Sequence, residues 1–593
     1  MEGILFDMKF GARRAEDVLS KTPVSLPLVI LFSLGVYFNA LSAGLFLDDI
    51  PQLLKNPWIK DVRYLPEIFS SGVLGFENKI IDQYRPLMYV IYMMNFHIAG
   101  LAVWFFHLVN VLFHAGTSVL VFLIARRLFL EKETAYPYIS SLMAGVFFAA
   151  HPIHTESVTW IGALPDVSYA FFFLLAFYLY ISLTPAPLPL GEGKRVRELI
   201  LYIASGAAFF LACLSKEPAL TFPLILAAYD YLIRGKKRLS FYIKSYALYF
   251  IVIAVYFALR MNALEGLAPV RKHADLSAWQ MALSVFPIFV QYFEKLLLPI
   301  NLNTFYIFHP VLSLSEPRAF VSILLTVSIF ISAYLIGRKN RLALFSFLII
   351  VVPLLPSFYI PAFGVTVFGE RYLYLPSFGF IMLMAMLVQY VLKRNERAFG
   401  VIALLLISVT ALYSAGTVMR NRVWKDDYTI WADTVKKSPD GAIPRNHFGY
   451  ALLTRGMIEE AIEHYEAAVR LDPAMHEAHA NMGNAYSQKQ EYARSIEHYR
   501  IAIGLRPAKA EYYYGLASAY DRMGSFNDAV ENYKTALRMN PALIDAHLAL
   551  GAAYGNKGML ALAIGEFEAA LRLDPANGAA RHNLNVALGM KRK

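Results

Sequence analysis

Apolar runs about twenty residues long recur through the first 420 residues and constrain the fold more than any other feature of the sequence. A helix needs roughly 20 apolar residues to cross a bilayer, where its backbone polar groups must bond within the segment. The runs therefore predict an all-α, polytopic membrane bundle. About eleven segments have suitable length and character: 24–46, 104–127, 138–153, 167–183, 198–214, 219–233, 241–260, 318–337, 342–358, 373–392 and 399–418.

The basic residues between these runs predict the orientation of the bundle. If the N-terminus is cytoplasmic and the spans alternate, every inside loop is basic, as the positive-inside rule requires. An odd number of spans then puts everything after residue 420 on the non-cytoplasmic side. Two further apolar stretches, 86–100 and 280–298, are interpreted as juxtamembrane or re-entrant helices, because counting either alone as a span reverses the pattern beyond it. The inside-loop residues are Arg126, Arg127, Lys194, Arg195, Arg197, Arg234, Lys236, Lys237, Arg238, Arg338, Lys339, Arg341, Lys393, Arg394 and Arg397.

A repeat with a strict period of 34 residues occupies the rest of the chain. Proline, an aromatic residue and alanine each recur in register, which is the tetratricopeptide pattern of two antiparallel helices per unit. The sequence thus divides into a membrane domain at 1–420, a linker at 421–439, and a repeat domain at 440–593 with four repeats and a capping helix. The residues in register are Pro439, Pro473, Pro507, Pro541 and Pro575; Tyr465, Tyr499, Tyr533 and Phe567; and Ala468, Ala502, Ala536 and Ala570.

Composition and charge exclude several functional classes. Hydrophobic residues make up 57% of the chain and charged residues 17%, whereas a soluble chain is about a quarter charged. The net charge of +11 lies mostly in short loops between apolar runs, so nucleic acid is not expected as a partner. The single cysteine, Cys213, excludes an intrachain disulfide and a thiolate metal cluster.

Ionisable residues gather at the span ends predicted to face the non-cytoplasmic side. Because such groups are costly near a bilayer, we expect them to line one water-facing cavity. Each also has a purely structural interpretation as a helix cap, an interfacial anchor or an ion pair. His151, His154 and Glu156 could share a metal, but interfacial histidines more often bond to backbone, and no metal site is predicted. The residues are Asp48, Asp49, His151, His154, Glu156, Asp166, Lys216, Glu217, Glu370 and Arg371.

Several of these motifs resemble one family of membrane enzymes. Asp48 and Asp49 after the first span resemble the acidic external loop of GT-C class glycosyltransferases. Together with this loop, five segments resemble the transmembrane and tetratricopeptide repeat-containing protein O-mannosyltransferases. One departure is the sequence GALPD, which lacks the basic residue expected before Asp166. The segments are YRPLMYVIY (84–92), FHLVNVLFH (106–114), HPIHTESVTWI (151–161), LSKEP (214–218) and GERYLYLPSFGF (369–380).

The resemblance implies an inverting transfer of one sugar, mannose or similar, from a polyprenyl-phosphate donor to a Ser or Thr hydroxyl of a protein. Such a hydroxyl needs a general base, which we assign to Asp48 or Asp49 without distinguishing them. The leaving phosphate needs positive charge, with Arg371 the first candidate and Lys216 the second. Neither a cofactor nor a metal is expected to be essential, and the repeats would bind the acceptor protein. Further phosphate candidates are Arg85 and Arg260, and the pocket residues are His151, His154, Glu156, Asp166, Glu217 and Glu370.

Two other functions remain open from the sequence. The chain could be a non-enzymatic membrane-anchored scaffold, although a simple anchor needs one span. It could also be a polysaccharide ligase using a polyprenyl-linked donor, although such enzymes are expected to rely on external arginines, which are few here. Simple repeats and near absence of cysteine favour a bacterial inner membrane with periplasmic repeats; in a eukaryote the membrane would be that of the endoplasmic reticulum.

Overall fold

The computed structural model describes residues 2–21, 23–77, 83–183, 192–235, 238–264, 266, 273, 275–364 and 366–591. Lys236 and Lys237 lie outside the described residues, as do the side chains of Lys194 and Arg195. Every regular element in the described ranges is helical, which confirms the all-α class. The chain divides into two compact units, residues 1–430 and 431–593.

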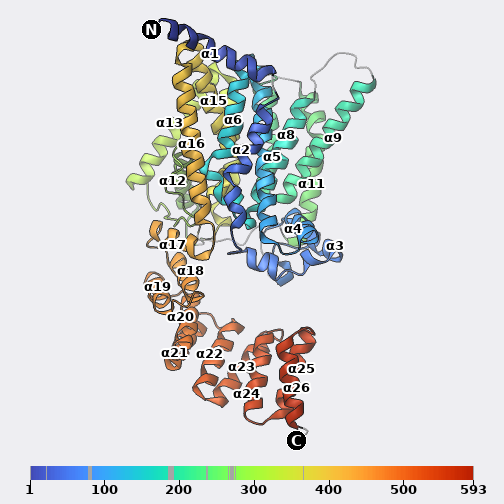
Figure 1. The fold of residues 1–593 in the computed structure, drawn as a ribbon, viewed down its shortest axis with the longest axis vertical. Coiled ribbons are helices and arrows are strands. Elements are labelled where there is room, and N and C mark those ends of the chain that lie inside the picture. The colour runs from blue at the N-terminus through green and yellow to red at the C-terminus, as the bar shows by residue number, and fades with distance from the viewer. Residues whose placement is uncertain are drawn as a thin grey trace. The chain divides into compact units, whose positions relative to one another are not determined.

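The first unit is a bundle of long helices joined by short 3-10 and irregular segments (Figure 1). Its helices are α1 (Glu2–Lys21), α2 (Ser25–Val36), α3 (Leu65–Ser70), α4 (Pro86–Ala99), α5 (Val103–Glu131), α6 (Pro137–Ala150), α7 (Thr155–Thr159), α8 (Leu164–Ser182), α9 (Glu192–Ser215), α10 (Phe222–Leu232), α11 (Leu239–Leu264), α12 (Ala278–Leu297), α13 (Pro317–Lys339), α14 (Arg341–Leu354), α15 (Pro376–Arg394) and α16 (Phe399–Val423). Helix α17 (Asp427–Lys437) crosses the division between the units.

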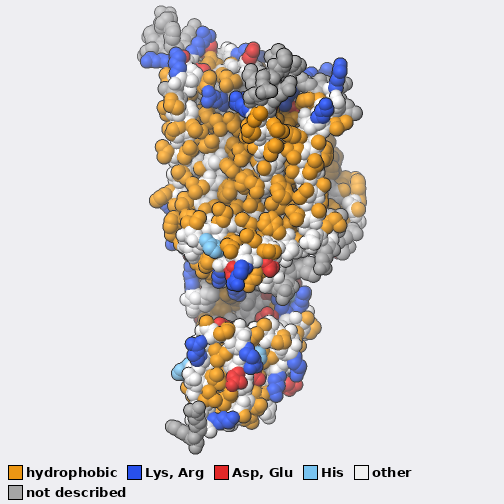
Figure 2. All heavy atoms as spheres, turned by 90° about the vertical axis from the view of Figure 1, so that its right-hand side faces the viewer, with side chains coloured by type: hydrophobic (Ala, Val, Ile, Leu, Met, Phe, Trp, Pro, Cys, Tyr) orange, Lys and Arg blue, Asp and Glu red, His pale blue; other side chains and the backbone are white. Residues whose placement is uncertain are grey.

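Nine helical segments of the described chain are long and apolar enough to cross a membrane, and the protein is a multi-pass membrane protein. They match nine of the eleven predicted spans. The other two, 138–153 and 219–233, fall on the shorter helices α6 and α10. On the face shown in Figure 2, a band of hydrophobic side chains covers this unit, and Lys and Arg side chains gather at the upper edge of the band.

The two stretches set aside as non-spanning are helical but do not lengthen the list of spans. The first stretch, 86–100, consists of the 14-residue helix α4 and its C-cap Gly100. Residues 280–298 fall in α12, which is 20 residues long and is not among the candidate spans. Its Ser277 closes a reciprocal cap with Gln280, which fixes where the helix begins.

Close packing positions the helices that carry the site. Gly379 in α15 lies so close to α14 that an added Cβ would meet the Ser346 carbonyl oxygen at 2.3 Å. Helix α5 lies among α2, α6 and α8, and all four helices contribute buried residues to one hydrophobic core. The ends of these helices are therefore held in fixed positions relative to one another.

The second unit is a helical solenoid. Four helix pairs, α18–α19, α20–α21, α22–α23 and α24–α25, follow one another along the chain, and α26 follows the last pair. Buried Tyr499, Tyr533 and Phe567 fill its core against small residues of the paired helices. The helices are α18 (Ala442–Leu453), α19 (Ile458–Leu471), α20 (His476–Gln488), α21 (Tyr492–Leu505), α22 (Ala510–Met523), α23 (Phe526–Met539), α24 (Ile544–Asn556), α25 (Leu560–Leu573) and α26 (Gly578–Lys591).

Substituting Gly551 tests this packing. A Cβ at Gly551 in α24 would lie 2.6 Å from the ring of Phe567 in α25, so Gly551→Val should destabilise the last repeat by about 2 kcal/mol. Hydrogen exchange of α24 and α25 in the full chain measures the effect. Gly565→Val in α25 is the control, because nothing lies within 4 Å of that position. Equal exchange in both variants would contradict the packing described here.

Candidate functional site

Asp49 is a buried anchor rather than an open carboxylate. Its side chain has no exposed surface and accepts hydrogen bonds from the backbone N–H groups of Phe46 at 3.3 Å and Gly162 at 2.8 Å. The pKa of Asp49 lies well above the usual range because the side chain is buried, although these two hydrogen bonds partly oppose that shift. Asp49 therefore fastens the segment after the first span to the turn between α7 and α8.

Asp48, its neighbour, is exposed. In the part of the chain that the structure describes, its carboxylate makes no hydrogen bond or ion pair. Packing around the group raises its pKa, while the nearby positive charges of Arg371 and Arg85 lower it. Of the two adjacent acids, Asp48 is thus the one available to a substrate.

Arg371 is held by Glu156 across 215 positions of sequence. One guanidinium nitrogen lies 2.5 Å from Glu156 Oε1, and the Arg371 backbone N–H donates to Oε2 at 3.0 Å. The guanidinium also lies over the rings of Trp160 and Tyr372, at 5.8 and 5.2 Å. The Glu156 side chain is 3% exposed and that of Arg371 is 29% exposed, so the positive charge of the pair is the one accessible to solvent.

Lys216 supplies the positive charge that the sequence lacks before Asp166. Lys216 follows the end of α9, and its ammonium lies 2.5 Å from Asp166 Oδ1 in the first turn of α8. Burial lowers the pKa of Lys216 to about 8, and Asp166 opposes that shift. Both side chains are almost fully buried, so this ion pair lies in the interior of the unit.

Glu217 connects the two remaining arginines. Its carboxylate lies 3.6 Å from an Arg85 nitrogen and 3.2 Å from one of Arg260. The charges of Arg85 and Arg260 lower the pKa of Glu217, against the effect of burial. The positive charge of Arg85 also lowers the pKa of Asp48 and of Lys216. Arg85 is therefore electrostatically connected to Glu217, Asp48 and Lys216.

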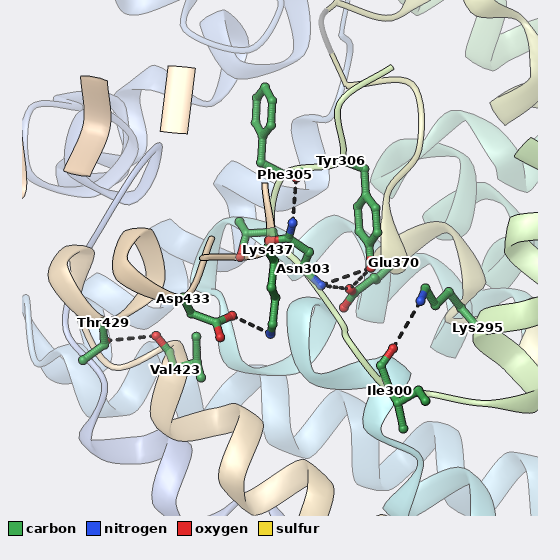
Figure 3. A network of polar contacts seen from close by, with 11 residues as sticks. Lys295, Ile300, Asn303, Phe305, Tyr306, Glu370, Val423, Thr429, Asp433 and Lys437 are labelled. Atoms are coloured by element: carbon green, nitrogen blue, oxygen red, sulfur yellow. Dashed lines mark hydrogen bonds and ion pairs between the residues drawn. The ribbon is translucent and has the colours of Figure 1, made fainter. Parts of the chain in front are cut away.

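Glu370 is bound to a different segment from Arg371. It is fully buried and accepts hydrogen bonds from the Asn303 backbone N–H at 2.5 Å and the Tyr306 hydroxyl at 2.6 Å (Figure 3). Burial raises its pKa to about 7. The structure therefore does not pair Glu370 with Arg371; the two adjacent side chains bind separate parts of the unit.

His151 and His154 lie in the interior, with no exposed surface. His151 Nε2 bonds to the Leu296 carbonyl at 3.3 Å, and His154 contacts the Phe148 carbonyl at 2.9 Å and the Ser377 hydroxyl at 2.8 Å. Burial lowers the pKa of His151 to about 4 and that of His154 as well, so both are neutral. Among the described residues, no group of three or more His, Cys, Asp or Glu side chains is arranged to hold a metal.

The aromatic and amide residues of the site were not predicted from the sequence. Trp160 and Tyr372 flank Arg371, and Asn303 and Tyr306 hold Glu370. The two flanking residues stand inside motifs already singled out, HPIHTESVTWI and GERYLYLPSFGF, so their place in those motifs was the available signal. Asn303 and Tyr306 belong to no such motif.

Comparison with known proteins confirms the repeats and the resemblance. The family described as TPR repeat matches residues 449–490, 483–524 and 522–558, and the family described as tetratricopeptide repeat matches 544–577. Protein O-mannosyl-transferase TMTC3 of Homo sapiens is 26% identical over 509 residues, covering 78% of this chain and 53% of the relative. Protein O-mannosyl-transferase F38B6.6 of Caenorhabditis elegans is 24% identical, covering 75% and 63%.

A shorter region is more similar to a second human relative. Protein O-mannosyl-transferase TMTC2 of Homo sapiens is 32% identical over 200 residues, which is 33% of this chain and 23% of the relative. This chain spans about half the length of the human TMTC3 relative. The similarity to TMTC3 nonetheless extends over most of the present chain.

The buried Glu370 makes stability depend on pH. A carboxyl whose pKa is raised from 4.5 to about 7 on folding stabilises the fold fully below pH 4.5, and that contribution is lost as pH rises to about 7. Glu370→Gln stays neutral, so its stability relative to wild type should increase by about 3 kcal/mol between pH 4 and pH 8. Thermal unfolding in detergent at both pH values measures this. Glu316→Gln, a half-buried glutamate that also accepts backbone N–H bonds, is the control and should show no such change.

Proposed function

We propose that the protein is a membrane glycosyltransferase that transfers a sugar, mannose or similar, from a polyprenyl-phosphate donor to a Ser or Thr hydroxyl of a polypeptide. The observation that carries the proposal is the exposed, unpaired Asp48 carboxylate beside the guanidinium groups of Arg371 and Arg85. A base next to two cations suits the removal of a hydroxyl proton together with departure of a phosphate. The named O-mannosyl-transferase relatives support the same reaction class.

In this mechanism Asp48 is the general base. A Ser or Thr hydroxyl is a weak nucleophile at neutral pH, so its proton must be removed as the oxygen attacks the sugar. The acceptor oxygen forms a bond to the anomeric carbon, the bond from that carbon to the phosphate oxygen breaks, and the proton passes to Asp48. Attack opposite to the leaving group inverts the anomeric configuration. Asp49, buried and bonded to backbone, positions Asp48 instead of reacting.

Arg371 is the favoured partner of the leaving phosphate. Its guanidinium offers five N–H donors, one of which bonds to Glu156, and it is more exposed than Lys216. Arg85 adds a second positive charge that acts on Asp48. Lys216 and Arg260 are held by Asp166 and Glu217, so we assign them to the support of the site. No metal is needed in this scheme, because phosphate is itself a good leaving group.

We further propose that the solenoid binds the acceptor polypeptide on the non-cytoplasmic side. Tetratricopeptide solenoids present a concave surface suited to an extended segment. Binding the acceptor within the same chain as the catalytic groups raises its effective concentration at them.

A transfer assay with a labelled polyprenyl-phosphate mannose and a Ser/Thr-rich polypeptide tests the assignment. Asp48→Asn should lower kcat by about 10²- to 10⁴-fold, because the general base is lost, while thermal stability stays that of wild type. Asp61→Asn is the matched control, a half-buried aspartate paired with Arg63 that should leave transfer unchanged.

Three outcomes would contradict the proposal in different ways. Full activity of Asp48→Asn removes the proposed base. Loss of transfer in Asp49→Asn with native stability would move the chemistry to the buried acid. Transfer to a glycan but not to a polypeptide would indicate a polysaccharide ligase, and no transfer by the wild-type chain would favour the scaffold.

A further inference from the structure

A second polar region lies at the opposite end of the membrane unit from Asp166 and Glu217. Helix α8 begins at Leu164, beside Asp166, and ends at Ser182. Helix α10 likewise begins at Phe222, directly after the segment of Glu217, and ends at Leu232. The far ends of both helices, with the end of α5, enclose a cavity of about 490 Å³ lined by Leu123, Arg126, Arg127, Leu130, Glu131, Tyr178, Ile181, Tyr229 and Arg234.

The lining of this cavity has an excess of positive charge. Three arginines face one glutamate, Glu131, which accepts a hydrogen bond from the Tyr229 hydroxyl at 3.1 Å. Arg126 lies over the ring of Tyr138 at 4.9 Å. Neither Arg126 nor Arg127 has a carboxylate partner in the portion of the chain that the structure describes.

The Arg234 side chain is almost fully buried. Its side chain is 7% exposed and contacts Asp230 at 3.4 Å and the Leu183 carbonyl at 3.0 Å. Asp230 also accepts from the hydroxyls of Tyr180 at 2.6 Å and Tyr246 at 2.8 Å, so its charge is shared among several donors. Asp230 therefore balances the charge of Arg234, and the excess positive charge of the lining comes from Arg126 and Arg127.

Two guanidinium N–H groups in the cavity lack an acceptor. The Nε atoms of Arg127 and Arg234 are buried and have no hydrogen-bond partner within the described ranges. A buried donor without an acceptor is costly, and nearly all buried polar groups in folded proteins have a hydrogen-bond partner, so each of these two donors calls for one. Phosphate oxygens are the acceptors that arginine binds best.

The rest of the lining is apolar. Leu123, Leu130 and Ile181 stand beside the arginines, and Leu130 is 42% exposed at the end of a candidate span. A ligand that fits both surfaces carries a negatively charged phosphate and a hydrocarbon chain. Basic residues at span ends also set topology, but that role requires neither a cavity nor buried guanidinium groups.

We propose that this cavity binds the phosphate headgroup of an anionic phospholipid, with Arg126, Arg127 and Arg234 as the phosphate ligands and the acyl chains along the adjoining apolar surface. Basic pockets between membrane helices bind such headgroups in this way. The site is independent of the transfer reaction proposed above, because it lies at the other ends of α8 and α10.

Native mass spectrometry of the full chain in neutral detergent tests the site, with phosphatidylglycerol as the anionic probe and phosphatidylcholine as the zwitterionic one. Wild type should retain phosphatidylglycerol in preference. Arg126→Gln and Arg127→Gln should each weaken that retention about fivefold, the effect of one arginine near a lipid headgroup. Arg338→Gln is the matched control, an exposed arginine at the end of candidate span α13 outside the cavity, and should retain the lipid as wild type does.

Thermal unfolding of the same proteins checks that the variants are folded and gives a second readout. Phosphatidylglycerol should raise the unfolding temperature of wild type and Arg338→Gln, and raise it less for the two cavity variants. Equal loss in Arg338→Gln, or no preference for phosphatidylglycerol in wild type, would overturn the proposal. Displacement of the lipid by glycerol phosphate alone would overturn the lipid source, since it would assign the cavity to a soluble phosphate.

Discussion

The site depends on the compensation of charges that the fold removes from water. Glu156 and Arg371 stand 215 positions apart, yet their side chains meet at 2.5 Å. A buried charge without its partner costs several kcal/mol, so each such pair fixes the relative position of the segments that carry it. Asp166 with Lys216, and Glu217 with Arg85 and Arg260, do the same for α8, α9 and α11. The geometry around Asp48 is a consequence of these pairings.

The general architecture could be predicted from the sequence because it follows from local periodicity. Twenty-residue apolar runs and a 34-residue repeat each determine a type of structure without knowledge of tertiary contacts. The shortest predicted spans were the least certain part. Residues 219–233 form only an 11-residue helix, because Pro218 and Pro223 restrict the backbone where a longer helix would begin.

The pairing of the site residues could not be predicted, because it depends on contacts between distant segments. Asp48 and Asp49 are adjacent residues of the same type, so the sequence does not distinguish them. The Gly162 backbone N–H bonds to Asp49, which becomes an anchor, while Asp48 stays exposed. Glu370 and Arg371 are adjacent and opposite in charge, which suggests a local ion pair. Their side chains instead find partners on different segments, near Tyr306 and on α7.

The short helix from Glu370 to Leu373 acts as a rigid coupling between two distant regions. Glu370 accepts hydrogen bonds from Asn303 and Tyr306, which joins the helix to the 303–306 segment. The charge of Arg371, the next residue, acts on Asp48. One turn of helix cannot rotate at one residue without rotating at the next. The segment between α12 and α13 is thus joined through Glu370 to the residue next in sequence, whose charge acts on Asp48.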